Sequence, residues 1–209
     1  MIRIEPPKPL RGRGRAPSTS REALSSIGLD LMIERGFAGV TVDDIADAAG
    51  IGRRTFFRYF PSKNDLLWGD FDALLERFAA DLRGEPAATS IVQCVHTGVR
   101  RFNEVPRAER DRHRHRMRLL LEEPELVAHS TVRYGAWRSV IAAFVADRVG
   151  AGEDSVVPQA VSWACLGVSL SAYRQWIREP DVDLLAAIDE SFRGLRAVFS
   201  GVDELGPGG

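Results

Sequence analysis

Cysteine and histidine are scarce in this chain. Its 209 residues include two cysteines and four histidines. Cys94 and Cys165 lack the spacing of metal ligands, and we expect two small buried side chains in a reducing compartment. His113 and His115 stand two residues apart, which turns them to different faces of a helix. The sequence therefore predicts no metal site, and it implies no cofactor.

Motifs of catalysis are missing as well. The chain contains no G-x-S-x-G elbow, no H-E-x-x-H pair, no phosphate-binding loop and no cluster of acids beside a nucleophile. An all-α enzyme is therefore the least favoured class of function.

Long apolar runs and strand-like alternation are also absent. No apolar run approaches the length of a membrane span, and the N-terminus lacks the core of a signal peptide. The chain is 44% apolar, which is enough for a core, and its apolar residues recur at helical spacing. We expect an all-α, cytoplasmic protein of about nine helices, without a membrane partner.

The net charge of −1 gives no sign of a nucleic-acid partner, but the charge is unevenly distributed. Residues 1–21 hold six basic side chains against one acidic side chain. We expect residues 1–17 to form a disordered basic arm. Its RGRGR segment, residues 11–15, is suited to a DNA minor groove, and a solubilising tail is the alternative.

A first helix is expected after Ser18 or Thr19, where Thr19 and Glu22 have the spacing of a capping box. The stretch Thr41–Lys63, TVDDIADAAGIGRRTFFRYFPSK, then predicts two short helices joined by a turn at Gly50. Between residues 48 and 64 it carries four basic side chains and no acidic one. A short basic, aromatic helix supported by a compact apolar helix is typical of a helix that enters the DNA major groove.

The second short helix divides into two faces. Phe56 and Phe60 are expected to point inward, and the side chains on the other side are expected to contact DNA. These are Arg53, Arg54, Thr55 and Tyr59. Lys63, in the first turn of the next helix, is placed to bind a phosphate. The alternative for each residue taken alone is a solvated surface side chain.

Residues 18–66 resemble the DNA-binding domain of the TetR family of bacterial regulators. The resemblance rests on GF at 36–37, on the whole Thr41–Lys63 stretch and on the two leucines at 66–67. It implies phosphate contacts by Thr41, Phe57, Tyr59 and Lys63. The family often has tyrosine at the position of Phe57, so Tyr59 is expected to take more of that role.

Beyond Lys63 the apolar pattern predicts one long helix over residues 62–83 and five further helices. Their expected ranges are 88–103, 108–121, 125–148, 155–178 and 182–199. We assign residues 67–202 to a helical domain for ligand binding and dimerisation, and residues 203–209 to a disordered tail.

One short helix is crowded with arginine and histidine. Its sequence RHRHRMR, residues 112–118, places Arg112 and Arg116 on one face. A solvated, partly paired helix face is one interpretation. Because apolar residues follow at 119–121, the alternative is an inward arginine pair that binds an anionic ligand.

The second half is similar to TetR-type regulators found beside mycofactocin biosynthesis genes. The similarity rests on WGDFD at 68–72, RHRHRMR, YGAWRSVIAAFVA at 134–146 and LGVSLSAYRQW at 166–176. It implies a long-chain acyl-CoA as effector, with Arg112 and Arg116 as partners of its phosphates. The aromatic residues expected to line an acyl tunnel are Trp68, Phe71, Trp137, Trp163 and Trp176; core packing is the alternative for each.

The last two helices are expected to form a homodimer. Small residues such as Ala164 and Ser171 would line one helix, and the large apolar face of the other, from Leu184 to Val198, would join them. The sequence thus predicts a ligand-responsive regulator, a repressor released from a palindromic double-stranded DNA operator by a small hydrophobic effector. An architectural DNA-binding protein without a ligand is the alternative.

Overall fold

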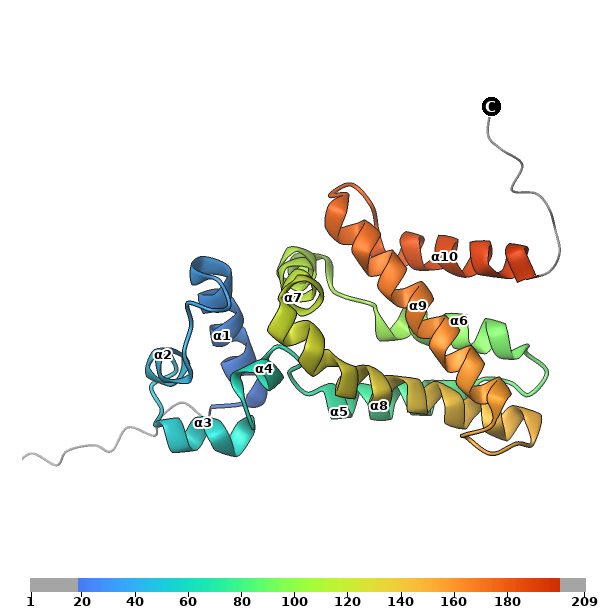
Figure 1. Ribbon diagram of the computed structural model, residues 1–209, viewed down its shortest axis with the longest axis horizontal. Coiled ribbons are helices and arrows are strands. Elements are labelled where there is room, and N and C mark those ends of the chain that lie inside the picture. Colours follow the sequence, from blue (N-terminus) through green and yellow to red (C-terminus); the bar gives the residue numbers. More distant parts are fainter. Residues whose placement is uncertain (1–18, 200–209) are drawn as a thin grey trace, which may run out of the picture.

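The computed structural model describes residues 19–199, which form ten α-helices and one short 3₁₀ helix (Figure 1). No strand occurs in this range, so the all-α prediction is confirmed. The predicted arm and tail lie outside the described residues. The helices are α1 (Arg21–Arg35), α2 (Val42–Ala48), α3 (Arg53–Tyr59), α4 (Lys63–Leu66), α5 (Phe71–Gly84), α6 (Ile91–Phe102), α7 (Arg110–Glu122), α8 (Pro124–Val149), α9 (Val156–Arg178) and α10 (Leu184–Phe199), with the 3₁₀ helix η1 at Arg107–Glu109.

Helices α1 to α4 form an N-terminal unit at one end of the molecule (Figure 1). Helix α1 begins after Ser20, whose hydroxyl accepts from the Ala23 N–H, so the expected cap at Thr19 is wrong by one residue. Thr41 caps α2 in a complete capping box with Asp44. Gly50, at φ 66°, makes the turn into α3 as expected.

The predicted long helix over residues 62–83 is interrupted. Helix α4 ends at Leu66, and α5 begins at Phe71. Between them the N–H of Trp68 bonds the carbonyl of Asp65, and Gly69 adopts a φ of 58°. A positive φ cannot continue a right-handed helix, so the apolar pattern persists through a turn that the periodicity does not reveal.

Helices α5 to α10 form a C-terminal unit in which α9 packs between α8 and α10. With 23 residues, α9 is long and apolar enough to cross a membrane by length and composition, contrary to the expectation that no segment is. Because α9 packs against two other helices, we interpret it as a core helix of this bundle.

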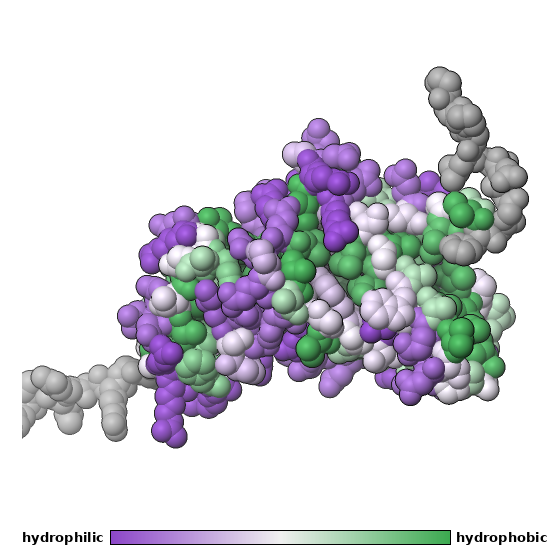
Figure 2. All heavy atoms as spheres, in the orientation of Figure 1, coloured by the Kyte–Doolittle hydropathy of each residue, from purple (hydrophilic) through white to green (hydrophobic). Residues whose placement is uncertain are grey.

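Most of the large apolar face of α10 is turned inward. Leu184, Ile188 and Phe192 are buried within the subunit. The prediction that this face makes the dimer is therefore wrong for those residues. On α9 four of the exposed residues are small: Ala160, Ala164, Gly167 and Ser171. Figure 2 shows apolar and weakly polar residues gathered over α9 and the end of the bundle distant from α1–α4.

Helices α5 and α6 approach closely at Gly98. A Cβ atom at this position would lie 2.7 Å from the Leu82 Cδ2 and 3.0 Å from the Phe78 ring. Both side chains are about 1% exposed and have no space into which to move. The close contact therefore depends on glycine in the middle of α6.

We predict that Gly98→Ala lowers the free energy of unfolding by about 1–3 kcal/mol, because the added methyl group overpacks the α5–α6 contact. Gly135→Ala is the matched control, since a Cβ atom added there would have no neighbour within 4 Å, and alanine there favours the helix by about 0.5–1 kcal/mol. Urea unfolding followed by circular dichroism measures both. Equal stability of the two variants would contradict the close contact.

Candidate functional site

Helix α3 presents an exposed basic and aromatic surface. Arg53, Arg54 and Phe57 are exposed, whereas Thr55 is half-buried. Arg53 donates to Asp43 of α2 at 2.7 Å and its guanidinium lies 5.5 Å from the Phe57 ring centroid. Arg54 makes no hydrogen bond or ion pair with any residue that the structure describes. Phe56 and Phe60 are fully buried, as predicted, so they fix the helix from behind.

Two of the residues predicted to bind phosphate already form hydrogen bonds with backbone carbonyls of this chain. The Tyr59 hydroxyl donates to the Thr19 carbonyl at 2.6 Å. The Lys63 ammonium donates to the carbonyls of Phe37 and Val40, both at 2.9 Å. A phenol has a single hydrogen to donate and an ammonium has three. Lys63 therefore keeps a donor for a phosphate in this arrangement, whereas Tyr59 would first have to release Thr19.

Thr41, the third predicted phosphate ligand, is exposed at the start of α2. Its hydroxyl accepts from the Asp44 N–H at 3.1 Å and also contacts the Asp44 carboxylate. Those hydrogen bonds, together with the one from the Thr41 N–H, hold the pKa of Asp44 below its usual value. Thr41 thus has a structural role as a cap, and it lies at the edge where α2 meets solvent.

A cavity of about 130 Å³ lies inside the C-terminal unit, among α5, α7, α8 and α9. Four predicted ligand residues line it: Trp68, Phe71, Arg116 and Trp137. The lining residues that sequence analysis missed include four that bear polar groups: Asn103, His113, Tyr134 and Tyr173. Tyr134 and Tyr173 each stand three residues before a tryptophan, so helical spacing could have placed each on the same face as that tryptophan.

Three predicted ligand residues lie elsewhere. Trp163 is 57% exposed and stacks with Arg138, whose guanidinium is 3.5 Å from the ring centroid, so its assignment to the cavity is wrong. Trp176 is buried behind the cavity wall against His113. Arg112 does not line the cavity but an adjoining groove, and it bonds residues of α1. In each case the helical pattern gave the element correctly but not the direction of the side chain.

One wall of the cavity holds a chain of buried polar groups. The Tyr173 hydroxyl donates to the Asn103 Oδ1 at 2.5 Å, and His113 Nε2 lies 3.1 Å from the same hydroxyl. Because the tyrosine hydrogen is used, His113 must donate through Nε2. Burial, with some repulsion from Arg116, lowers the pKa of His113 to about 4, so the ring is neutral at physiological pH.

Other polar atoms at the cavity have no partner among the described residues. They are Trp68 Nε1, Arg116 Nε and the Tyr134 hydroxyl. Burial, and then the nearby Arg112, lower the pKa of Arg116, while Glu109 acts in the opposite direction. Two of the three atoms are N–H donors. Buried donors without partners favour a ligand that brings oxygen acceptors into an otherwise apolar space.

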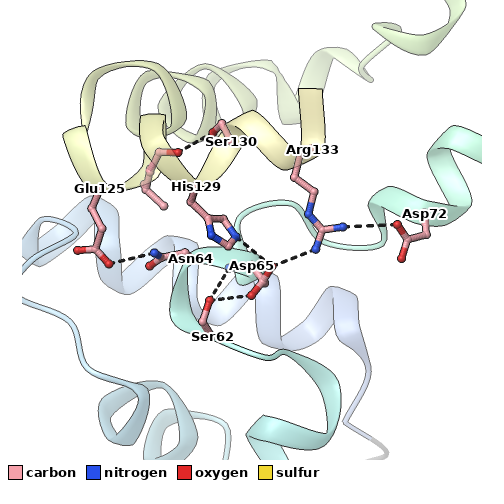
Figure 3. Close-up of polar contacts among 9 residues, drawn as sticks. Ser62, Asn64, Asp65, Asp72, Glu125, His129, Ser130 and Arg133 are labelled. Carbon is pink, nitrogen blue, oxygen red and sulfur yellow. Dashed lines mark hydrogen bonds and ion pairs between the residues drawn. The ribbon is translucent and has the colours of Figure 1, made fainter. Parts of the chain in front are cut away.

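Asp65 of α4 joins the N-terminal unit to α8 (Figure 3). Its carboxylate accepts hydrogen bonds from Ser62 at 2.7 Å, Arg133 at 3.0 Å and His129 at 3.1 Å. Burial alone would raise the pKa of Asp65, but these three bonds outweigh it and hold the pKa below its usual value. The carboxylate is thus charged, 7% exposed and shared between two helices of different units.

Two side contacts extend this junction. Asn64 donates to Glu125 at the start of α8 at 3.0 Å, and Arg133 also reaches Asp72 at 3.4 Å (Figure 3). The cavity wall is directly adjacent, because Trp68 follows Asp65 by three residues and Tyr134 follows Arg133. The Trp68 and Tyr134 rings meet edge to face at 5.7 Å. The same two segments therefore carry the cavity wall and the polar junction.

Comparison with known proteins finds two family matches along the chain. Residues 27–67 match the family described as bacterial regulatory proteins, tetR family, and residues 89–200 match the MftR C-terminal domain. The protein named as the mycofactocin biosynthesis transcriptional regulator MftR of Mycobacterium tuberculosis is 42% identical over 192 residues, covering 92% of this chain and 96% of that protein.

Two solved structures share the fold. FadR of Thermus thermophilus, a TetR family repressor in complex with lauroyl-CoA, has 21% identity and a TM-score of 0.56, and the match covers 90% of this chain and 100% of that chain. FadR of Bacillus subtilis in complex with stearoyl-CoA has 15% identity and a TM-score of 0.58, with 86% and 97% covered. At such identities the likeness shows the fold alone.

The matched relatives are transcriptional regulators, not enzymes, which agrees with the absence of catalytic motifs. The basic helix α3, its support by α1 and α2, and the MftR-like second half lead to one conclusion. The chain belongs to the TetR family of bacterial transcriptional regulators.

Proposed function

We propose that this regulator is a cytoplasmic homodimeric repressor that leaves a palindromic operator when a long-chain acyl-CoA binds in the C-terminal unit. The observation that carries the proposal is the apolar cavity with unpaired N–H donors, whose wall lies beside the Asp65 junction. The acyl-CoA ligands of the FadR structures support this class of effector. The mycofactocin-type relative supports the regulatory role.

The reading of DNA is assigned to α3. Arg54 is exposed and forms no hydrogen bond or ion pair within residues 19–199, so its guanidinium is available for the bidentate contact to guanine. Arg53 and Thr55 flank it and serve the same groove. Phe57 and Tyr59 of α3, with Thr41 and Lys63 on the neighbouring segments, position the helix on the phosphates. Phe57 is 43% exposed and contributes apolar contact only, since it has no hydroxyl.

The size of the cavity implies that effector binding moves its walls. At about 130 Å³ the cavity is close to the size that holds a single benzene ring. A long acyl chain needs more space, and the wall residues next to the junction are Trp68 and Tyr134. An acyl chain that displaces these rings also displaces Asp65 and Arg133. The effector then favours a state in which α4 and α3 are oriented differently, and this difference in affinity releases DNA.

The dimer is assigned to α9 and α10. Small exposed residues on α9 let a second copy approach closely, and Trp163 and Val198 add apolar area, being 57% and 58% exposed. A two-fold dimer would place its two α3 helices in successive major grooves. An architectural protein would need no cavity with unpaired donors, so the cavity favours the ligand-responsive function.

We predict that Arg54→Ala weakens binding to the operator by about 1–3 kcal/mol and leaves binding to random DNA nearly unchanged, because only the base contact is lost. Arg83→Ala, which changes an exposed arginine at the end of α5, is the control for net charge. Fluorescence anisotropy on an operator fragment and a scrambled fragment measures both. Equal losses on the two DNAs would remove Arg54 from the role of base reader.

We predict that acyl-CoAs release the operator, with affinity rising by about 0.8 kcal/mol for each additional buried CH₂ group. Arg116→Met is expected to weaken release by palmitoyl-CoA, because a charged donor at the cavity is lost. Arg83→Met, on the exposed end of α5, is the control. The readout is the palmitoyl-CoA concentration that releases half of the labelled operator. If no acyl-CoA from C8 to C18 releases DNA, this effector class is wrong.

A further inference from the structure

Arg112 of α7 links the C-terminal unit to α1. Its guanidinium pairs with the Asp30 carboxylate and donates to the Ser26 carbonyl, and it reaches the Ser26 hydroxyl at 2.8 Å. This is a second polar connection between the two units, separate from the Asp65 junction on α4. Asp30 is exposed by 59% and Arg112 by 32%, so solvent screens the ion pair and its contribution to the free energy of unfolding is modest.

The same arginine lines a groove that continues the cavity. The groove has a volume of about 650 Å³, and Ser25 and Ser26 of α1 lie on one side of it. Trp68, His113 and Arg116 line both the groove and the cavity. A ligand whose apolar body fills the cavity therefore has its other end in the groove, next to Arg112 and Arg116.

Two arginines, Arg112 and Arg116, line the inner end of the groove, and Glu109 acts electrostatically on Arg116 there. Arg116 makes no ion pair with any described residue, and it lies close enough to Arg112 for the two guanidiniums to repel. Asp30 bonds only one of them. An anion placed between the two would satisfy both. The groove is also lined by four acidic residues, Glu22, Asp70, Glu104 and Glu109. Glu22 and Asp70 lie in its outer part together with Arg77.

We propose that the anionic end of the effector and Asp30 compete for Arg112, an inference that rests on the proposed function. In the effector-free protein Arg112 holds α1 through Asp30 and Ser26. When a carboxylate or phosphate enters the groove, Arg112 and Arg116 bind it together and Arg112 releases Asp30. The head group of the effector thus acts directly on the DNA-binding unit, in addition to the displacement of the cavity wall by its apolar body. The effector is accordingly an anionic amphiphile.

The test uses the full-length protein and three probes with the same C16 chain: palmitoyl-CoA, palmitate and hexadecanol. Removing the competitor with Asp30→Asn is expected to tighten binding of the anionic probes by about two- to five-fold, the range of an exposed ion pair, and to leave hexadecanol unchanged. Arg112→Gln is expected to weaken the binding of both anionic probes. If Asp30→Asn binds only palmitate more tightly, the carboxylate is the anion that Arg112 recognises. If it binds only palmitoyl-CoA more tightly, the phosphates are.

Asp183→Asn is the matched control, because Asp183 forms a comparable exposed ion pair with Arg110 at the start of α7 but does not involve α1. Tryptophan fluorescence titration measures each dissociation constant, and thermal unfolding confirms that each variant is folded. Unchanged affinity of Asp30→Asn for both anions would overturn the competition, as would equal tightening of hexadecanol. If the wild-type protein binds none of the three probes, the effector class of the proposed function falls with it.

Discussion

A buried carboxylate, Asp65, holds the two units of this regulator in register. It is 7% exposed and accepts bonds from Ser62 of its own unit and from His129 and Arg133 of α8 (Figure 3). A buried charge tolerates few arrangements, because each partner that is lost leaves part of its desolvation cost uncompensated. The orientation of α4, and of the recognition helix before it, therefore depends on where α8 places Arg133.

The small cavity matters because it lies next to the Asp65–Arg133 pair. The cavity holds about 130 Å³ and is closed toward the junction by Trp68 and Tyr134. Each ring stands on the same segment as one member of the Asp65–Arg133 pair. An effector that enlarges the cavity cannot leave the pair in place, since packed interiors respond to inserted volume by shifting rather than by compressing. Under the proposed function, ligand size would thus be converted into a change in the direction of α4.

The sequence predicted the short helices of the N-terminal unit well because their motif combines caps, a turn glycine and buried aromatics at fixed spacing. The sequence analysis was wrong where the outcome depends on the direction of a side chain or of the backbone in three dimensions. The apolar pattern of residues 62–83 hid the positive φ of Gly69. Trp163 shares the composition of the cavity residues but stacks on Arg138 at the surface. Tyr59 and Arg112 found partners far away in sequence, Thr19 and Asp30, which no local periodicity encodes.

The most direct test of the coupling between cavity and DNA-binding unit is the effect of palmitoyl-CoA on operator affinity in Asp65→Asn. We predict that the variant binds operator and palmitoyl-CoA separately within about three-fold of wild type, but that palmitoyl-CoA no longer weakens operator binding, because a neutral amide cannot hold Arg133 as a charge pair does. Asp72→Asn, which changes the 83% exposed partner of Arg133, should keep the response. Full release of the operator from Asp65→Asn would contradict the coupling through Asp65.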